Sequence, residues 1–229
     1  MADKKGPQQA NYVVYDLETT GLKVGKHGVC EIALLALDSI TLEETDRYEA
    51  IIAPYQLKVT DDDGNEIEID YEFDTKALEI NGLTEQKIRA GKDAKEVCKD
   101  IIAFEKRNRS GSKKSKLVGH NIIKFDNPHL AFFFYCLGFD IEKVFDSNYF
   151  KDTMDMSQDM FPEATGRGEH TLARLCERFG VDKFDAHSAM PDVIANAAVF
   201  VKILKKQRGE AISLGIEQKD RLRETFKIA

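Results

Sequence analysis

Three apolar segments near the N-terminus constrain the fold more than any other feature. Residues 11–16 (NYVVYD), 29–37 (VCEIALLAL) and 48–53 (YEAIIA) have the length and composition of strands, and short connections join them into an expected antiparallel meander. Beyond them the predicted elements alternate: helices at 94–107, 126–137, 153–160, 171–179 and 191–206, a short strand at 117–120 and a last strand within 144–152. This order predicts a mixed α/β sheet of about five strands, the first three antiparallel, flanked by helices.

The composition is that of an ordinary globular domain. With 229 residues, of which 42% are apolar and 32% charged, the chain can build one sizeable core. No apolar run approaches the ~20 residues of a membrane span, and the polar start MADKKGPQQAN lacks the apolar core of a secretory signal. The four cysteines are scattered, without a C-x-x-C pair, which indicates buried thiols in a reducing compartment. We therefore expect an intracellular, cytoplasmic protein that has no membrane partner.

Charge divides the chain into segments. We expect a polar tail at residues 1–10, one domain at 11–208 and a charged helical tail at 209–229, which is a plausible docking helix. Within the domain, residues 58–76 are an acidic insertion that forms either a hairpin or a solvated loop. Residues 105–116 are a basic loop, which either extends the substrate track by contacting phosphates outside the active site or is a solvated linker. The net charge of −7 is weak evidence against a nucleic-acid partner, because bound cations can supply the positive charge locally.

The segment DLETTG, residues 16–21, carries the strongest chemical signal. If Asp16 ends a strand, the two-residue period of a strand places Asp16 and Glu18 on the same face. Two carboxylates in such a position repel each other unless a cation lies between them, and Mg²⁺ prefers oxygen ligands of this kind. The alternative is a pair of surface acids at the end of a strand.

Two later segments offer further ligands. In GHNIIKFD, residues 119–126, Asp126 begins a predicted helix and could be either a ligand or the N-cap of that helix. In HSAMPD, residues 187–192, Pro191 suits a first helical turn, from which Asp192 would project. His187 precedes this helix, and is either functional or structural.

The three segments, in this order and at this spacing, resemble the exonuclease motifs of the DEDD superfamily, in its histidine-containing (DnaQ-like, DEDDh) branch. That branch includes the proofreading subunits of bacterial replicases and ribonuclease T. The segments INGLT at 80–84, DT at 152–153 and TLARLC at 171–176 are also similar to the family. The resemblance spans residues 12 to 204 and implies a ribonuclease-H-like fold and a metal-dependent 3′→5′ exonuclease. The stretches at 61–74 and 105–116 look like insertions relative to the family core.

The resemblance also implies a role for each motif residue. Asp16, Glu18, Asp126 and Asp192 would hold two Mg²⁺ or Mn²⁺ ions, with Asp16 bridging them. His187 would be the general base that takes a proton from the attacking water, a role that suits an unperturbed pKa of about 6.5. The products would be nucleoside 5′-monophosphates and a strand shortened at its 3′ end.

The substrate implied by the resemblance is a single-stranded nucleic acid with a free 3′ end, DNA being favoured over RNA. The expected contacts are the residues of the first motif, an apolar wedge after the glycine, and the second motif: Leu17, Thr19, Thr20, Leu22, His120, Asn121 and Phe125. Ordinary core packing is the alternative for Leu22 and Phe125. An RNA-trimming enzyme of the same family and an inactive nucleic-acid-binding module stay open as alternatives, as do a polymerase partner and a homodimer.

Overall fold

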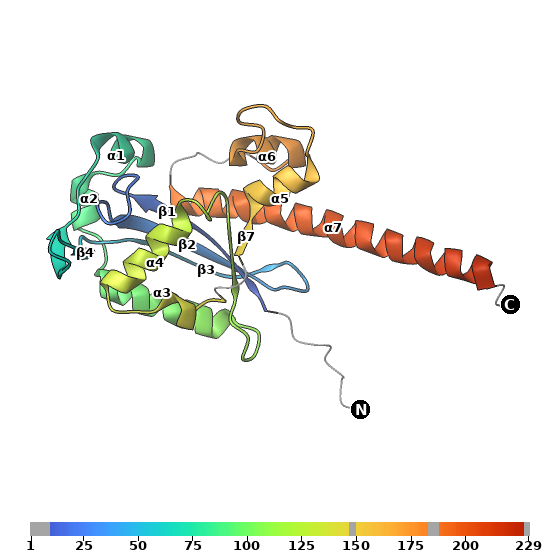
Figure 1. Ribbon diagram of the computed structural model, residues 1–229, viewed down its shortest axis with the longest axis horizontal. Helices are drawn as coiled ribbons and strands as arrows, with labels where there is room; N and C mark the ends of the chain where they lie inside the picture. Colours follow the sequence, from blue (N-terminus) through green and yellow to red (C-terminus); the bar gives the residue numbers. More distant parts are fainter. Residues whose placement is uncertain (1–9, 147–149, 183–187, 227–229) are drawn as a thin grey trace.

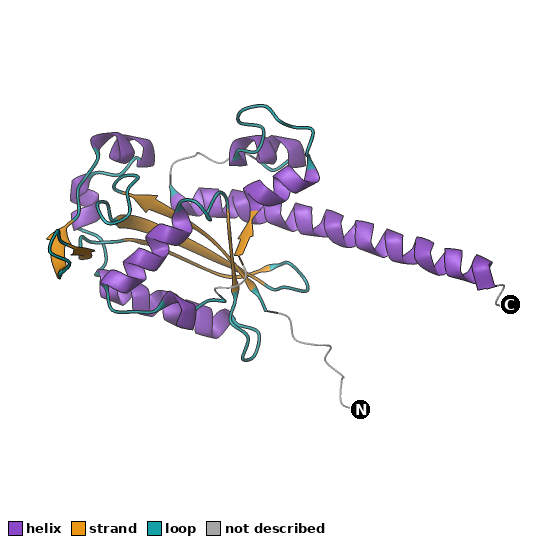
Figure 2. Cartoon of the chain, in the orientation of Figure 1, coloured by secondary structure: helices purple, strands orange, loops and turns teal. Residues whose placement is uncertain are grey.

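A mixed five-stranded sheet forms the centre of the molecule (Figures 1 and 2). The structure, a computed structural model, describes residues 10–146, 150–182 and 188–226, with side chains up to Gly209. The strand order is β3-β2-β1-β6-β7. Strands β1 (Tyr12–Thr19), β2 (Val29–Leu37) and β3 (Glu44–Ile51) are antiparallel, and β6 (Lys116–Gly119) and β7 (Phe150–Asp152) extend the sheet in parallel to β1. The predicted sheet is confirmed.

Two strands differ from their predictions in extent. Strand β1 continues to Thr19, beyond the predicted end at Asp16. Strand β3 spans Glu44–Ile51, whereas its predicted range was 48–53. Its first half, Glu44–Arg47, is polar because β3 lies at the edge of the sheet and is half exposed. The apolar pattern therefore revealed only its second half. Strand β2, by contrast, is buried at every position, because it pairs on both sides and is covered on both faces.

Helices cover the two faces of the sheet and define two cores. Along β1 the side chains alternate, so that Val13, Tyr15 and Leu17 pack on one face and Tyr12 and Val14 on the other. The first face is covered by α3 (Ala94–Asn108) and α4 (Asp126–Cys136), and the second by α5 (Thr153–Met160), α6 (Leu172–Phe179) and α7 (Ala189–Phe226). Asp16 and Glu18 have the register of Tyr12 and Val14, which places them on the α7 face.

The acidic segment forms a hairpin that is anchored in the core. Strands β4 (Gln56–Thr60) and β5 (Glu66–Asp70) pair with each other in a separate two-stranded sheet. Leu57 and Tyr71 are buried in the same cluster as the α3 and α4 side chains, so the hairpin begins before residue 58 and is not a detached insertion. Of the two interpretations, the hairpin is confirmed. The chain then continues through α1 (Thr75–Asn81) and α2 (Glu85–Arg89), which Asp74 and Thr84 cap.

The basic segment at 105–116 lies far from the first carboxylate motif. Its first four residues belong to α3, where the buried Glu105 pairs with Arg109 and accepts a hydrogen bond from the backbone N–H of Ser115 at 3.0 Å. Lys116 lies opposite Tyr12, at the start of β1, whereas Asp16 and Glu18 lie near the end of β1. At about 3.3 Å per residue, this separates the segment from Glu18 by roughly 20 Å. A direct contact of the segment with substrate at the carboxylates does not fit this placement.

The C-terminal helix is continuous. Helix α7 runs from Ala189 through Gly209 to Phe226, so the expected boundary at residue 209 is not a break between two helices. A single glycine inside a helix costs only about 1 kcal/mol relative to alanine, which the rest of the helix can offset. Figure 1 shows the C-terminal half of α7 extending away from the sheet. None of the helices in the described ranges combines the length and apolarity that crossing a bilayer requires.

Candidate active site

Three carboxylates meet where β1 passes under the start of α7. Asp16 and Glu18 project from β1, and Asp192 from the first turn of α7. One oxygen of each carboxylate lies within 4.8 Å of the other two. This proximity follows from the two-residue period of β1 and from the packing of α7 on β1 and β2. The fold therefore brings Asp16 and Glu18 together with an acid from a distant segment, as expected of a cation site.

Asp126 approaches the cluster from the opposite side of β1. It is the first residue of α4, is only 4% exposed, and accepts a hydrogen bond from the backbone N–H of Leu17. Phe125 occupies the N-cap position, so Asp126 is not the N-cap of α4. The charge of Asp126 raises the pKa of Asp16, which places the two carboxyl groups within electrostatic reach of each other. Three of the four predicted carboxylates thus converge, and the fourth, Asp126, lies within electrostatic reach of Asp16 and Glu18.

The cluster is electrostatically unfavourable without cations. Burial is the main cause that raises the pKa of Glu18 to about 8, followed by the charges of Glu31, Asp192 and Asp126. Burial also raises the pKa of Asp126 to about 7, and burial together with the charge of Asp126 holds the pKa of Asp16 well above its ordinary value. Convergent oxygen donors that repel one another in a partly buried site are the donor set that hard divalent cations require.

A fifth acid, Glu31, lies beside the cluster. Glu31 is opposite Glu18 in the β1–β2 ladder, which becomes irregular at the next residue, Thr19. It is 8% exposed and accepts a hydrogen bond from the backbone N–H of Ala189, the first residue of α7. Its Oε2 atom has no hydrogen-bond partner in the described part of the chain. Glu31 therefore connects β2 to the start of α7. In the sequence, the only sign of this role is a charged residue inside an otherwise apolar strand.

The second motif is held by Asp152 at the end of β7. Its carboxylate accepts hydrogen bonds from the backbone N–H groups of Asn121 at 2.8 Å, Ile123 at 3.3 Å and Met154 at 2.9 Å. Asn121 has a φ of 61°, a left-handed conformation that asparagine tolerates. Asp152 thus shapes the turn that leads into Asp126. In the sequence, Asp152 was noted only as part of the short segment at 152–153 that is similar to the family.

His120 takes part in a buried chain of hydrogen bonds. Its Nδ1 atom lies 3.0 Å from Oγ1 of Thr153, which donates to Oδ1 of Asn196 on α7 at 2.7 Å. Burial lowers the pKa of His120 to about 4, so the ring is neutral at physiological pH. This series of hydrogen bonds connects the end of β6 with α5 and α7. A contact of His120 or Asn121 with substrate stays a prediction.

The predicted substrate residues of the first motif mainly hold the turn after β1. The Thr20 hydroxyl donates to the carbonyl of Glu72 at 2.7 Å and accepts from the backbone N–H of Gly28, and the Thr19 hydroxyl donates to the carbonyl of Gly21. Leu17 is buried in the core. Since these side chains have structural contacts, any substrate contact here would involve the backbone of Leu17 and Thr19.

Leu22 and Phe125 form two parts of one surface. Leu22 is 77% exposed, so ordinary core packing does not explain it. Its carbonyl lies 3.4 Å from Nε2 of the buried His129, whose ring centroid lies 4.7 Å from that of Phe125. His129 therefore links the loop after the first motif to α4. His187, the predicted general base, lies outside the described residues.

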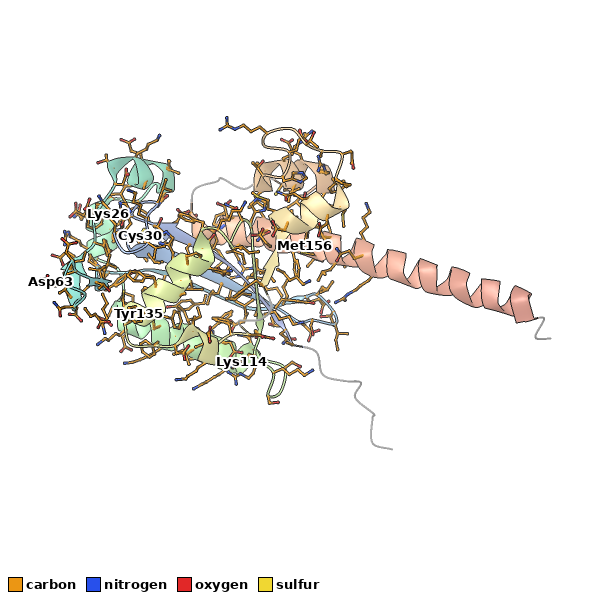
Figure 3. The ribbon with its side chains drawn as sticks, viewed as in Figure 1. Lys26, Cys30, Asp63, Lys114, Tyr135 and Met156 are labelled. Carbon is orange, nitrogen blue, oxygen red and sulfur yellow. The ribbon has the colours of Figure 1, made fainter. Side chains whose placement is uncertain are left out.

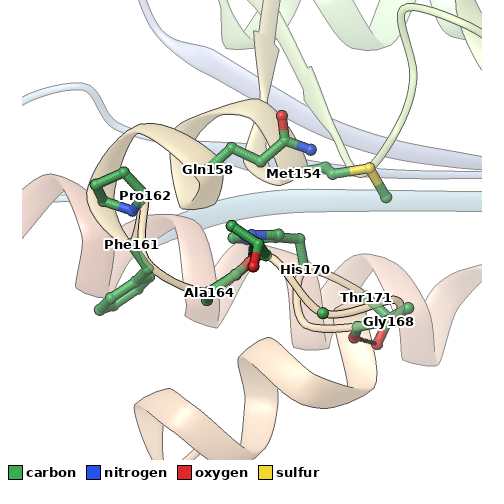
Figure 4. A pocket seen from close by; sticks show the side chains of 10 residues that line it. Met154, Gln158, Phe161, Pro162, Ala164, Gly168, His170 and Thr171 are labelled. Carbon is green, nitrogen blue, oxygen red and sulfur yellow. Dashed lines mark hydrogen bonds between the residues drawn. The ribbon is translucent and has the colours of Figure 1, made fainter.

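The hollow between α5 and α6 is separate from the carboxylates (Figure 4). It has a volume of about 450 Å³ and is lined by residues of α5 and the loop to α6. His170 at its wall is bound on both sides, with Nδ1 2.7 Å from Oγ of Ser157 and Nε2 2.8 Å from the carbonyl of Ala164. These contacts make His170 a structural residue of the α5–α6 loop.

Comparison with known proteins identifies the family of the chain. Residues 13–200 match the family model described as Exonuclease (RNase T). The PolC-type DNA polymerase III of Bacillus subtilis is 26% identical over 96% of this chain and 13% of that protein. The DNA polymerase III subunit epsilon of Haemophilus influenzae is 27% identical over 82% of this chain and 65% of that protein. The chain thus spans only part of the length of the curated relatives it matches.

Among solved structures, the fold is similar to that of Escherichia coli exonuclease I in complex with a dT13 oligonucleotide. The TM-score is 0.67 at 21% identity, over 90% of this chain and 43% of that chain. The sheet order and this likeness define a ribonuclease-H-like fold. The chain belongs to the exonuclease family.

Proposed function

We propose that the chain removes nucleotides from the 3′ end of single-stranded DNA, releasing nucleoside 5′-monophosphates, with two Mg²⁺ or Mn²⁺ ions as cofactors. The convergence of Asp16, Glu18 and Asp192, with Asp126 close by, is the observation that carries this proposal. These residues come from three distant segments of the chain, and the fold brings them together.

The four carboxylates fit divalent cations. Asp16 is the expected bridging ligand by resemblance to the family, and the charges of Asp126, Glu18 and Asp192 all raise its pKa. Bound cations would supply positive charge to the attacking and leaving oxygens of an in-line displacement, and Mg²⁺ has the required preference for carboxylate oxygens.

The protein residues orient the reaction. Asp126 fastens the start of α4 to β1 through the N–H of Leu17, and Glu31 fastens the start of α7 to β2. These two contacts hold carboxylates of different elements in one geometry. His187, five residues before Asp192, would take a proton from the attacking water as general base.

The preference for DNA is supported by the relatives. The curated relatives are DNA polymerase III proteins, and the similar exonuclease I structures include complexes with deoxyoligonucleotides. The exposure of Leu22, beside the first motif, supports the proposal that this side chain wedges against a terminal base. A polymerase as partner is proposed on the same relatives, and an intracellular location and a homodimer stay predictions.

The test is the product pattern on end-labelled oligonucleotides. A 5′ label should give a ladder of shortened strands and a 3′ label a mononucleotide, both abolished by EDTA. Asp16→Asn should abolish degradation, whereas Asp62→Asn, an exposed acid of the hairpin turn, should retain it. Wild-type activity of Asp16→Asn, or internal fragments, would overturn the proposal.

Matched RNA separates the alternatives. Faster degradation of RNA than of DNA of the same sequence would establish the RNA-trimming alternative. Binding without hydrolysis in the presence of Mg²⁺ would establish the inactive binding module. The complete set of acids argues against that module.

A further inference from the structure

A second hollow adjoins the turn after β1, on the side of α1. Its volume is about 530 Å³, within the range of about 300–1,000 Å³ typical of ligand sites. Two segments line it, the loop of residues 21–28 and residues 72–76. The lining side chains are Lys23, Lys26, His27, Glu72, Phe73, Asp74, Thr75 and Lys76.

We propose that this hollow, called here the upstream site, binds an upstream nucleotide of the single DNA strand whose 3′ end occupies the carboxylate cluster. The inference rests on the proposed function. It adds a specific location for DNA contact, outside the carboxylates, and names the residues that make it.

The charges of the upstream site suit a phosphate. Neither Lys23 nor Lys76 forms an ion pair with any residue in the described ranges. The two acids, in contrast, are both engaged: Glu72 pairs with Lys26 at 3.0 Å, and the Asp74 carboxylate accepts hydrogen bonds from the backbone N–H groups of Lys76 and Ala77. Two lysines therefore stay available to bind the phosphate backbone of a strand.

Phe73 supplies an aromatic surface beside these lysines. Its side chain is half-buried, packs against Tyr71 with ring centroids 5.3 Å apart, and lines the hollow. Aromatic rings next to cationic side chains are the usual means by which proteins hold single strands without reading their sequence, because every base has a face that can stack. The upstream site therefore provides lysines for the phosphate of a nucleotide and an aromatic ring for its base.

The upstream site is fixed directly to the first motif. The hydroxyl of Thr20 donates to the carbonyl of Glu72 at 2.7 Å, and the backbone N–H of Asp74 donates to the carbonyl of Thr20 at 2.8 Å. Thr20 is two residues from Glu18, and Lys23 follows the exposed Leu22. A strand whose last base lies against Leu22 therefore passes the upstream site as it leaves the carboxylate cluster.

The opposite end of the sheet provides a matched control. Figure 3 shows Lys26 and Lys114 in widely separated parts of the molecule. Lys113 and Lys114 precede Lys116, which pairs with Tyr12 at the start of β1. The pair Lys113 and Lys114 thus carries the same charge as Lys23 and Lys76 but lies away from the carboxylates.

The test measures binding of fluorescent dT10 and dT3 by anisotropy, from about 50 to 400 mM NaCl, in an Asp16→Asn background that prevents degradation. Lys23→Ala with Lys76→Ala should weaken dT10 binding about tenfold at low salt. It should reduce the slope of log affinity against log salt by about 1.4, that is, 0.7 for each lost phosphate contact. The advantage of dT10 over dT3 should shrink. Phe73→Leu should weaken dT10 binding without changing the slope.

Lys113→Ala with Lys114→Ala should leave the dT10 slope as it was. An unchanged slope in the Lys23 and Lys76 variant, or an equal change in the control pair, would overturn the upstream site. Lys23→Gln with Lys76→Gln gives a second variant if the alanine variant fails to fold. Hydrolysis of labelled DNA by the wild type separates the two proposals. If hydrolysis occurs and the slope is unchanged, only the upstream site is wrong, and if neither hydrolysis nor binding occurs, both are wrong.

Discussion

Replacing Glu18 by glutamine should stabilise the metal-free protein. The same change should remove most of the stabilisation that Mg²⁺ gives. The pKa of Glu18 is raised from 4.5 to about 8, first by burial and then by neighbouring acids. An acid whose pKa is higher in the folded state keeps its proton on folding, so the folded state is favoured below about pH 4.5. That advantage is lost as the pH rises from about 4.5 to about 8. Glu18→Gln cannot ionise and should escape this loss.

The size of the effect follows from the same values. A rise from 4.5 to about 8 corresponds to at most about 5 kcal/mol. Water and counterions at this partly exposed site reduce the expected difference between Glu18→Gln and wild type to about 2 kcal/mol near pH 8. For a chain of this size, that corresponds to a difference in melting temperature of roughly 4–8 °C. The difference should vanish near pH 4.5.

The assay is thermal unfolding in EDTA and in Mg²⁺ at about pH 5 and pH 8. At a Mg²⁺ concentration of about 100 times the dissociation constant, the wild type should gain about 2.7 kcal/mol at pH 8, and Glu18→Gln much less. Asp62→Asn is the control for removal of an acid elsewhere. Equal melting temperatures of wild type and Glu18→Gln in EDTA at pH 8, or a difference independent of pH, would refute the reasoning.

Three further substitutions test other parts of the site. His187→Ala should lower turnover by roughly 10²–10⁴-fold and keep the stabilisation by Mg²⁺, and loss of that stabilisation would argue against a general base. Asp152→Ala should destabilise the fold by about 2–4 kcal/mol in urea unfolding, because it leaves buried N–H groups unpaired, whereas the exposed Asp159→Ala should cost little. Leu22→Ala should weaken binding of a 3′-terminated strand several-fold at unchanged melting temperature, since Leu22 is 77% exposed, and a large loss of stability would show that it packs in the core.

The local pattern of the chain was enough to predict the sheet and the four acids. Apolar segments of strand length occur at β1 and β2, and alternation along β1 predicts that Asp16 and Glu18 share a face. The same reasoning missed the first half of β3, because an edge strand carries polar residues that resemble a loop. Pattern reading also divided α7 at Gly209, where helical hydrogen bonding continues.

The contacts that arrange the site were not visible in the sequence. Glu31 stands out in the sequence only as a charged residue inside an apolar strand, and the β1–β2 register is what places it beside Glu18 and the start of α7. His129 has no motif to mark it, yet it joins Leu22 to Phe125. The basic segment has the charge expected for a DNA contact, and only its pairing with the start of β1 shows that it lies at the end of the sheet away from the carboxylates.

Residue type and spacing by themselves determined the chemistry of this protein, because hard-cation ligands and strand periodicity are local properties of the chain. Tertiary structure decided whether distant acids meet. Parallel pairing brings the end of β6, which leads to Asp126, beside β1, and packing of α7 on the sheet brings Asp192 to the same place. Both depend on contacts between residues about 100 or more positions apart, whose free energy comes from the folded core and cannot be assigned to any single segment.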